Sequence, residues 1–407
     1  MYYTLNENVY IVAGKSKGCI YALNKAKLFS VNKALADKLI EINQNGLSVA
    51  DDVDYELKDI LQQFIKNDLI KISQTHSSTH IEDIICKDTG SKFAWIEITN
   101  KCNLKCIHCY NESDSHCDNI MSLKEFYRVV DYLVRNEFTK IQVTGGEPFL
   151  NKEILKQMLN YVVGKFSYIE IFTNGTLITD DWFEYLLKND IHIALSVYSY
   201  NPQTHDYVTR VQGAFDRTNT TIENLKKFGI PYRVCNVLMK GIELGEKNTE
   251  LYTLSDDKDV VRVTGRAGFN LLSDELIKKR LITKETFQSP ITRQFCQRLI
   301  SGHNCFNDKI YIAANLDVFP CVMERRIKHG TLAQDNFLLD YDIRKFTKDK
   351  IEECTECEYR YACFDCRPNS LSKRLNEKPW YCTYEPLTGN WKNVDEFILK
   401  LRCELDR

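Results

Sequence analysis

The stretch CNLKCIHC, residues 102–109, places three cysteines within eight residues, directly after an apolar run at 93–98. A [4Fe–4S] cluster normally takes four cysteine ligands. Three thiolates on one tight loop can therefore hold three irons and leave the fourth iron open, and open metal positions are where substrates and cofactors bind. The alternative is a structural zinc site completed by His108 or Cys117, although such sites favour paired C-x2-C spacings with a full ligand set.

The composition indicates an ordinary chain of 407 residues, long enough for two or three domains. Lys+Arg 54 and Asp+Glu 56 nearly cancel, so charge gives no reason to expect nucleic acid or an anionic membrane as a partner. No apolar stretch reaches about 18 residues, and the first residues do not resemble a signal peptide. We therefore expect a cytoplasmic protein, in which sixteen cysteines indicate metal binding rather than disulfides.

Regions of different pattern follow one another along the chain. Residues 1–75 predict a small module of three short strands and two helices capped by Asn32 and Asp54, and the polar residues 76–91 predict a linker. In residues 92–285 strand candidates alternate with helices, which predicts an α/β fold with a parallel sheet or barrel and its chemistry at the carboxyl ends of the strands. Residues 286–390 have little regular pattern, so metal clusters would have to staple them, and 391–407 predict a C-terminal helix.

Further candidate site residues lie where the predicted strands of 92–285 end. In chain order they are Gly145, Gly146, Glu147, Asn174 and Ser196, and a further candidate, Arg210, lies between two predicted strands. The two glycines let backbone atoms approach a ligand, and the glutamate beside them can accept from an ammonium group. Gly-Gly and Asn-Gly alone are common turns, and an isolated arginine is often a surface residue.

The C-x3-C-x2-C spacing after the first strand of the α/β region resembles the hallmark of the radical S-adenosylmethionine (SAM) superfamily. The resemblance implies a partial (β/α)6 barrel in which SAM binds the open iron and is cleaved to a 5′-deoxyadenosyl radical. It implies that the glycine-rich turn holds the methionyl amino group, that His108 packs on the adenine, and that Asn174 lies in a TNG-like SAM-binding segment. It also implies that Ser196 contacts the ribose and that Arg210 reaches the SAM carboxylate. Many relatives continue with Asp-Gly after this serine, whereas VYSY follows here at 197–200, so no catalytic acid is carried over.

The cysteines of the C-terminal third resemble those of the SPASM domain of radical SAM peptide-modifying enzymes. They are Cys296, Cys305, Cys321, Cys354, Cys357, Cys363, Cys366 and Cys382. The family's run is C-x2-C-x5-C-x3-C, so one residue is missing before Cys366, and Leu316 replaces the family's glycine before Cys321.

The resemblance implies two auxiliary [4Fe–4S] clusters, with two zinc sites as the alternative. One cluster would take Cys305, Cys321 and Cys366, with Cys296 as a candidate fourth ligand; without it, an open iron could bind a substrate thiolate. The other would take the remaining members of the set: Cys354, Cys357, Cys363 and Cys382. The chain's other cysteines are interpreted as packing residues: Cys19, Cys86, Cys117, Cys235 and Cys403.

The first module resembles the winged-helix, PqqD-like leader-recognition element of ribosomal-peptide maturases, in which an exposed strand edge binds an extended peptide. A nucleic-acid-binding winged helix is the alternative, and the module's balanced charges disfavour it. Together the resemblances imply a radical SAM/SPASM maturase, similar to sactisynthases or ranthipeptide synthases, that binds the leader of a precursor peptide. It would use SAM, three [4Fe–4S] clusters and a one-electron reductant such as flavodoxin or ferredoxin.

The expected product is an oxidative thioether between a Cys sulfur and a carbon of the peptide. Carbon–carbon or carbon–oxygen crosslinking of a peptide remains an alternative within the same class. Oxidation of a folded protein, as in sulfatase maturation, and a non-catalytic cluster or zinc protein that binds peptide are alternatives from other classes.

Overall fold

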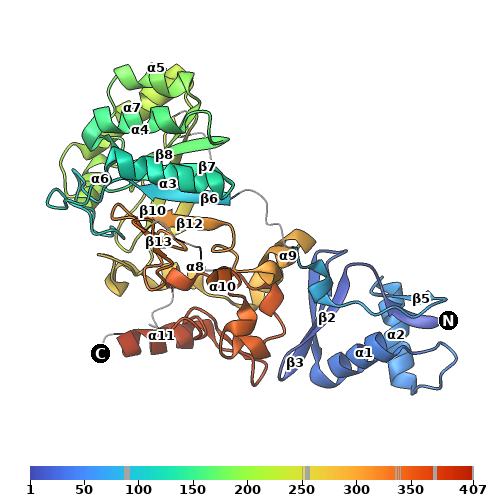
Figure 1. Ribbon diagram of the computed structural model, residues 1–407. Coiled ribbons are helices and arrows are strands. Elements are labelled where there is room, and N and C mark those ends of the chain that lie inside the picture. Colours follow the sequence, from blue (N-terminus) through green and yellow to red (C-terminus); the bar gives the residue numbers. More distant parts are fainter. Residues whose placement is uncertain are drawn as a thin grey trace.

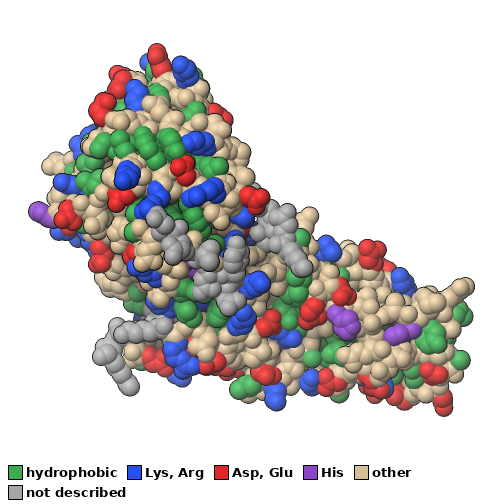
Figure 2. All heavy atoms as spheres, in the orientation of Figure 1, with side chains coloured by type: hydrophobic (Ala, Val, Ile, Leu, Met, Phe, Trp, Pro, Cys, Tyr) green, Lys and Arg blue, Asp and Glu red, His purple; other side chains and the backbone are tan. Residues whose placement is uncertain are grey.

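The computed structural model describes residues 1–86, 92–249, 251–252, 257–334, 337, 339, 341–369 and 374–405. Figure 1 shows an N-terminal module at one end and a layered α/β region at the other, with the C-terminal region between them. Figure 2 shows Lys and Arg side chains interspersed with Asp and Glu over the face in view. Among the described residues, no helix is long and apolar enough to cross a membrane.

The N-terminal module contains the predicted strands and helices. Its elements are β1 (Tyr2–Leu5), β2 (Val9–Ala13), β3 (Lys17–Ala22), β4 (Lys27–Asn32), α1 (Lys33–Asn45), α2 (Tyr55–Lys66) and β5 (Ile70–Ser73). Strands β2, β3 and β4 form an antiparallel sheet, while β1, which the sequence analysis did not predict, pairs with β5. Asn32 and Asp54 cap the two helices as predicted, because their side chains accept from the amides of Leu35 and Leu57.

A nine-stranded sheet dominates the rest of the chain, with the order β11-β10-β9-β8-β7-β6-β12-β13-β14. Its first six strands in the chain run parallel to their neighbours: β6 (Lys92–Glu97), β7 (Phe138–Thr144), β8 (Tyr168–Thr173), β9 (Ile191–Ser196), β10 (Tyr232–Leu238) and β11 (Asp257–Val260). The predicted α/β fold with a central parallel sheet is thereby confirmed. The sequence predicts the last of these strands at 260–263, and the structure places it three residues earlier, at Asp257–Val260.

Helices connect the parallel strands and bury their apolar faces against the sheet. They are α3 (Leu123–Arg135), α4 (Lys152–Val162), α5 (Asp181–Lys188), α6 (Pro202–Thr209) and α7 (Ala214–Phe228), with a 3-10 turn at Pro148–Asn151. The sequence also predicts a capping box at Ser122 and Glu125, and it is present at α3. The Ser122 hydroxyl accepts from the amide of Glu125, and the glutamate carboxylate accepts from the serine amide. The sequence analysis did not predict α6, a short helix that begins at Pro202 and carries few apolar residues.

The C-terminal region has more regular structure than predicted. Its helices and strands are α8 (Asp274–Arg280), α9 (Arg293–Ser301), β12 (Lys309–Ile312), β13 (Asp317–Phe319), β14 (Gly330–Thr331), α10 (Tyr341–Arg344), β15 (Tyr384–Glu385), β16 (Asn390–Trp391) and α11 (Val394–Leu405). Strand β12 pairs in parallel with β6, so this region extends the central sheet. Short 3-10 turns lie at Phe269–Leu271, Lys284–Phe287, Lys348–Lys350, Cys354–Glu356, Arg360–Ala362 and Arg367–Asn369.

The N-terminal module is fastened to a cysteine-bearing loop of the C-terminal region. The amide of Lys15 donates to the carbonyl of Glu356 over 2.9 Å, and the Tyr21 hydroxyl donates to the carbonyl of Glu358 over 2.9 Å. The intervening residues predicted as a linker include a 3-10 turn, Ile81–Ile84, whose two isoleucines are buried in the core shared by both regions. The module is therefore docked on the rest of the chain.

Candidate functional site

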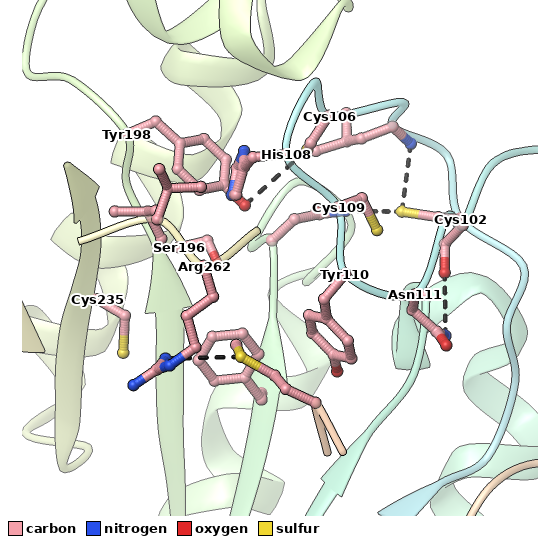
Figure 3. A pocket seen from close by; sticks show the side chains of 18 of the residues that line it. Cys102, Cys106, His108, Cys109, Tyr110, Asn111, Ser196, Tyr198, Cys235 and Arg262 are labelled. Carbon is pink, nitrogen blue, oxygen red and sulfur yellow. Dashed lines mark hydrogen bonds between the residues drawn. The ribbon is translucent and has the colours of Figure 1, made fainter. Parts of the chain in front are cut away.

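One cavity of about 290 Å³ lies where the parallel strands β8, β9 and β10 end. All three cysteines of the 102–109 loop line it (Figure 3). The other predicted site residues that line it are His108, Gly145, Gly146, Asn174 and Ser196. Residues from separate strands thus meet in one place, as expected for the carboxyl edge of a parallel sheet.

Backbone hydrogen bonds fix the cysteine loop to helix α6 and to the loop residue Asp114. The amide of Cys102 donates to the carbonyl of Asp114 over 2.9 Å, and those of Lys105 and Ile107 donate to the carbonyls of Thr209 and Val208 over 3.0 Å. The thiol sulfur of Cys102 also accepts from the amide of Leu104 at 3.4 Å. These contacts within the protein hold the loop beside the cavity.

Gly145 and Gly146 lie against the backbone that leads into this loop. A Cβ on Gly146 would stand 2.1 Å from the carbonyl oxygen of Lys101, and one on Gly145 would stand 2.4 Å from that of Thr99. The amide of Gly146 donates to the Thr99 carbonyl over 2.7 Å. The sequence analysis assigned the glycines to close approach of a ligand, whereas their tightest contact is with the chain itself.

Glu147 does not line the cavity, although the resemblance implied that it belongs to the SAM site. Its carboxylate is completely buried and accepts from the Thr173 hydroxyl at 2.7 Å and from the amides of Phe149 and Asn174 at 3.0 and 2.8 Å. Burial raises its pKa, although these donors oppose the shift. Through these hydrogen bonds to Thr173 and Asn174, Glu147 stabilises the loop that follows β8.

Arg210 also lies away from the cavity. It is exposed at the end of α6 in the left-handed backbone region, and its guanidinium lies 4.7 Å from the ring centre of Tyr207. The predicted contact of Arg210 with a SAM carboxylate thus has no counterpart in the geometry of the cavity.

His108 and Tyr198 form one wall of the cavity. Their ring centres are 4.6 Å apart in an edge-to-face arrangement, and the Tyr198 hydroxyl lies 3.9 Å from the sulfur of Cys106. Loss of water around His108 lowers its pKa to about 4, so the imidazole is neutral at physiological pH. A neutral ring with a buried Nδ1 that lacks a protein partner suits contact with a flat heteroaromatic group.

Two arginines near the loop carried no signal in the sequence. The guanidinium of Arg266 donates to the carbonyls of Cys106 and Ser113 over 3.3 and 2.9 Å, so it holds the loop from behind. Arg262 lines the cavity (Figure 3) and pairs with Asp259 at 2.6 Å. Both arginines follow β11. This segment contains no recognisable motif, so nothing in the sequence assigns either arginine to the site. Cys235, interpreted as a packing residue, lines the same cavity.

The C-terminal cysteines fall into two groups. Cys354, Cys357, Cys363 and Cys382 line one small cavity, which is the set assigned to one auxiliary cluster. For the other set, burial raises the pKa of Cys321 to about 11, and the thiolates of Cys366 and Cys305 lie close enough to contribute.

Cys296 lies elsewhere in the structure. It is completely buried in α9, and it interacts electrostatically with Cys19 and Tyr21 of the N-terminal module. The structure thus does not bring the candidate fourth ligand to Cys305, Cys321 and Cys366.

These cysteines fit iron–sulfur clusters in their chemistry and grouping. Each cysteine around a four-iron cube binds a different iron, so the sulfurs surround a space instead of converging on one point. Among the described residues, no three His, Cys, Asp or Glu side chains converge as ligands of a single ion. The first loop offers three thiols around a cavity, and the 354–382 set offers four.

Residues 96–251 match the family model described as the Radical SAM superfamily. The chain is 34% identical over 179 residues to "Antilisterial bacteriocin subtilosin biosynthesis protein AlbA" of Bacillus subtilis (strain 168), an alignment that covers 44% of this chain and 38% of AlbA. It is 23% identical over 345 residues to "AdoMet-dependent heme synthase" of Methanosarcina barkeri, covering 72% of this chain and 96% of that protein.

A solved structure, Streptococcus suis SuiB bound to precursor peptide SuiA, is similar with a TM-score of 0.56 and 17% identity. The likeness covers 93% of this chain and 98% of SuiB, and at this identity it concerns the fold. The chain and SuiB thus share their fold.

Proposed function

We propose that this chain, whose central region is a radical SAM domain, is a maturase that crosslinks a ribosomally synthesised peptide. The observation that carries the proposal is the convergence of Cys102, Cys106, Cys109 and His108 with Asn174 and Ser196 on one cavity. A radical SAM domain implies SAM and a [4Fe–4S] cluster. When bound there, they would supply a 5′-deoxyadenosyl radical that removes a hydrogen atom from the substrate.

Each part of the cavity would have its own task. The three cysteines of the loop would bind the cluster, and His108 would pack on the adenine of SAM. Ser196 would contact the ribose, while the turn at Gly145 and Gly146 would keep the loop in place and present backbone atoms to the methionyl group. Glu147 and Arg266 would act as positioning residues, through the loop after β8 and through the cysteine loop.

The N-terminal module would bind the leader of the precursor peptide at β4. This strand is the edge of the antiparallel sheet and its residues are mostly exposed, including Phe29 at 40%. The other edge, β2, is covered at Val9, whose carbonyl accepts from the Thr79 hydroxyl at 3.5 Å. An extended peptide can add to an open edge through main-chain hydrogen bonds, with side-chain pockets for selectivity. SuiB, similar in fold, was solved with a precursor peptide.

We divide the chain into a leader-recognition module (1–75), a linker (76–91), a radical SAM barrel (92–285), an auxiliary-cluster domain (286–390) and a C-terminal helix (391–407). The auxiliary-cluster domain would hold two [4Fe–4S] clusters. Joining a thiol to a C–H carbon removes one hydrogen atom to the deoxyadenosyl radical, one proton from the thiol, and one electron. An auxiliary cluster would take up that electron. The set Cys305, Cys321 and Cys366 leaves one iron without a protein thiolate and would accept the substrate's sulfur there.

The bond type is tested by co-expressing the chain with the cysteine-containing product of a short reading frame beside its gene. Mass spectrometry should show a loss of two hydrogens per link, and the linked cysteines should resist alkylation. A peptide that loses two hydrogens but keeps alkylatable thiols would indicate a carbon–carbon or carbon–oxygen crosslink instead. A peptide of unchanged mass, with SAM still cleaved, would contradict the peptide substrate.

Iron analysis of the anaerobically reconstituted protein tests the cofactor content. Three clusters predict about 12 irons per chain. A value near four, with zinc bound, would contradict the auxiliary clusters and leave the first site intact. A flavodoxin or ferredoxin would supply the electron in the cell, and dithionite would replace it in the assay.

A further inference from the structure

A buried group of charged side chains lies between the two C-terminal cysteine sets. Its centre is Asp365, which follows Cys363 by two residues and precedes Cys366 by one. Its carboxylate is paired with Lys348 Nζ at 3.2 Å and with Arg367 Nε at 2.6 Å. The exposed fractions of Lys348, Asp365 and Arg367 are 6%, 3% and 0%, so water contributes little to their solvation.

This group carries an excess of positive charge. Lys348 and Arg367 share the single carboxylate of Asp365. A buried net charge is costly unless an opposite charge compensates it, so the excess cation needs an anion nearby.

The geometry supplies a place for that anion. Lys348 lines the small cavity together with Cys354, Cys357, Cys363 and Cys382. A second lysine of this cavity, Lys378, is already paired with Glu353 at 3.2 Å and Glu385 at 3.3 Å. Lys348 is therefore a poorly neutralised cation of the cavity, and four thiolates around an iron–sulfur core form an anion.

We propose that Lys348, held by Asp365, is a positioning residue that neutralises the cluster bound by Cys354, Cys357, Cys363 and Cys382 and raises its reduction potential. The inference rests on the proposed auxiliary clusters. A fixed positive charge stabilises the reduced, more negative form of a cluster, because cluster potentials depend on local charge and hydrogen bonding. The charge of Lys348 would thereby make this cluster a better electron acceptor.

The test is a potentiometric titration, followed by electron paramagnetic resonance, of the full chain with Cys102, Cys106 and Cys109 replaced by alanine, which leaves the auxiliary signals alone. Lys348→Met removes the charge and keeps the side-chain length, while Asp365 keeps its partner Arg367. Lys348→Arg retains the charge, and Lys350→Met removes a neighbouring exposed lysine.

We expect about eight irons per chain in every variant. One midpoint potential should become more negative in Lys348→Met and remain in place in the other two variants. Unchanged potentials in Lys348→Met at full iron content would overturn the inference. If Lys348→Met loses about four irons and Lys348→Arg keeps them, the charge requirement is supported; if both lose them, packing explains the site and the inference fails. Absence of auxiliary iron in the parent protein would instead defeat the proposed clusters themselves.

Discussion

The two groups of cysteines in this chain are built in opposite ways. The first group occupies eight residues shortly after strand β6 of the parallel sheet, and backbone hydrogen bonds to Asp114, Val208 and Thr209 hold its loop. The second group is spread over residues 305–382, where helices and strands are short. Buried ion pairs and contacts with the N-terminal module stabilise this region. A short motif next to a sheet strand is enough to bring the first three cysteines together. The second group depends on tertiary contacts, which cannot be read from the spacing of its cysteines.

The largest effects should separate the two groups by reaction step. Cys106→Ala should abolish SAM cleavage, because three thiolates are needed to leave a single open iron. Cys363→Ala should leave SAM cleavage measurable while it abolishes the crosslinked peptide. Chromatography of 5′-deoxyadenosine and mass spectrometry of the peptide check the two steps. Loss of SAM cleavage in both variants would mean that the groups do not act separately.

Gly146→Val should come next, since its side chain would overlap the Lys101 carbonyl. We expect the cysteine loop to shift, with loss of most SAM cleavage and about four irons, and with the auxiliary iron retained. Gly229→Asn is the matched control, because nothing lies within 4 Å of the added Cβ and Asn tolerates the left-handed backbone there. Full iron content in Gly146→Val would show that the close contact is not needed.

Arg266→Leu should weaken the first site about 10- to 100-fold, as is typical when a residue that orients metal ligands is lost. Arg210→Leu should have little effect, since that side chain is exposed over Tyr207. SAM affinity and the rate of 5′-deoxyadenosine formation measure both. The reverse ranking would favour the role that the family resemblance implied for Arg210.

Cys296→Ala should have the smallest effect, because the residue is buried in α9 near Cys19 and lines neither cysteine-lined cavity. Iron content should stay at the parent level, with a loss of about 1 kcal/mol in stability from the small cavity. Cys305→Ala is the comparison and should lower the iron content. Equal iron loss in the two variants would restore Cys296 as a ligand.

The sequence predicted the features that local rules determine. Helix caps at Asn32, Asp54 and Ser122 follow from short-range hydrogen bonding, and the alternation of strands and helices predicted the parallel sheet. The convergence of His108 and Ser196 followed from their places near strand ends. Nothing local could predict that β12 pairs with β6, since that contact joins segments more than 200 residues apart.

The side-chain contacts at the site depend on tertiary structure in the same way. Glu147 and Arg210 are at sequence positions where a ligand contact was expected, but tertiary hydrogen bonds engage the first and solvent surrounds the second. Arg266 was missed because an arginine gains its role here from carbonyls about 150 residues away. Motifs thus predicted which loops form the cavity, and the side-chain contacts required the structure.

The most direct test of the account is anaerobic reconstitution of the full chain with iron and sulfide, followed by SAM and dithionite. The account predicts formation of 5′-deoxyadenosine and methionine, and none from the Cys106→Ala variant under the same conditions. Reconstituted protein that binds iron at the first loop and yields no 5′-deoxyadenosine would contradict the central claim.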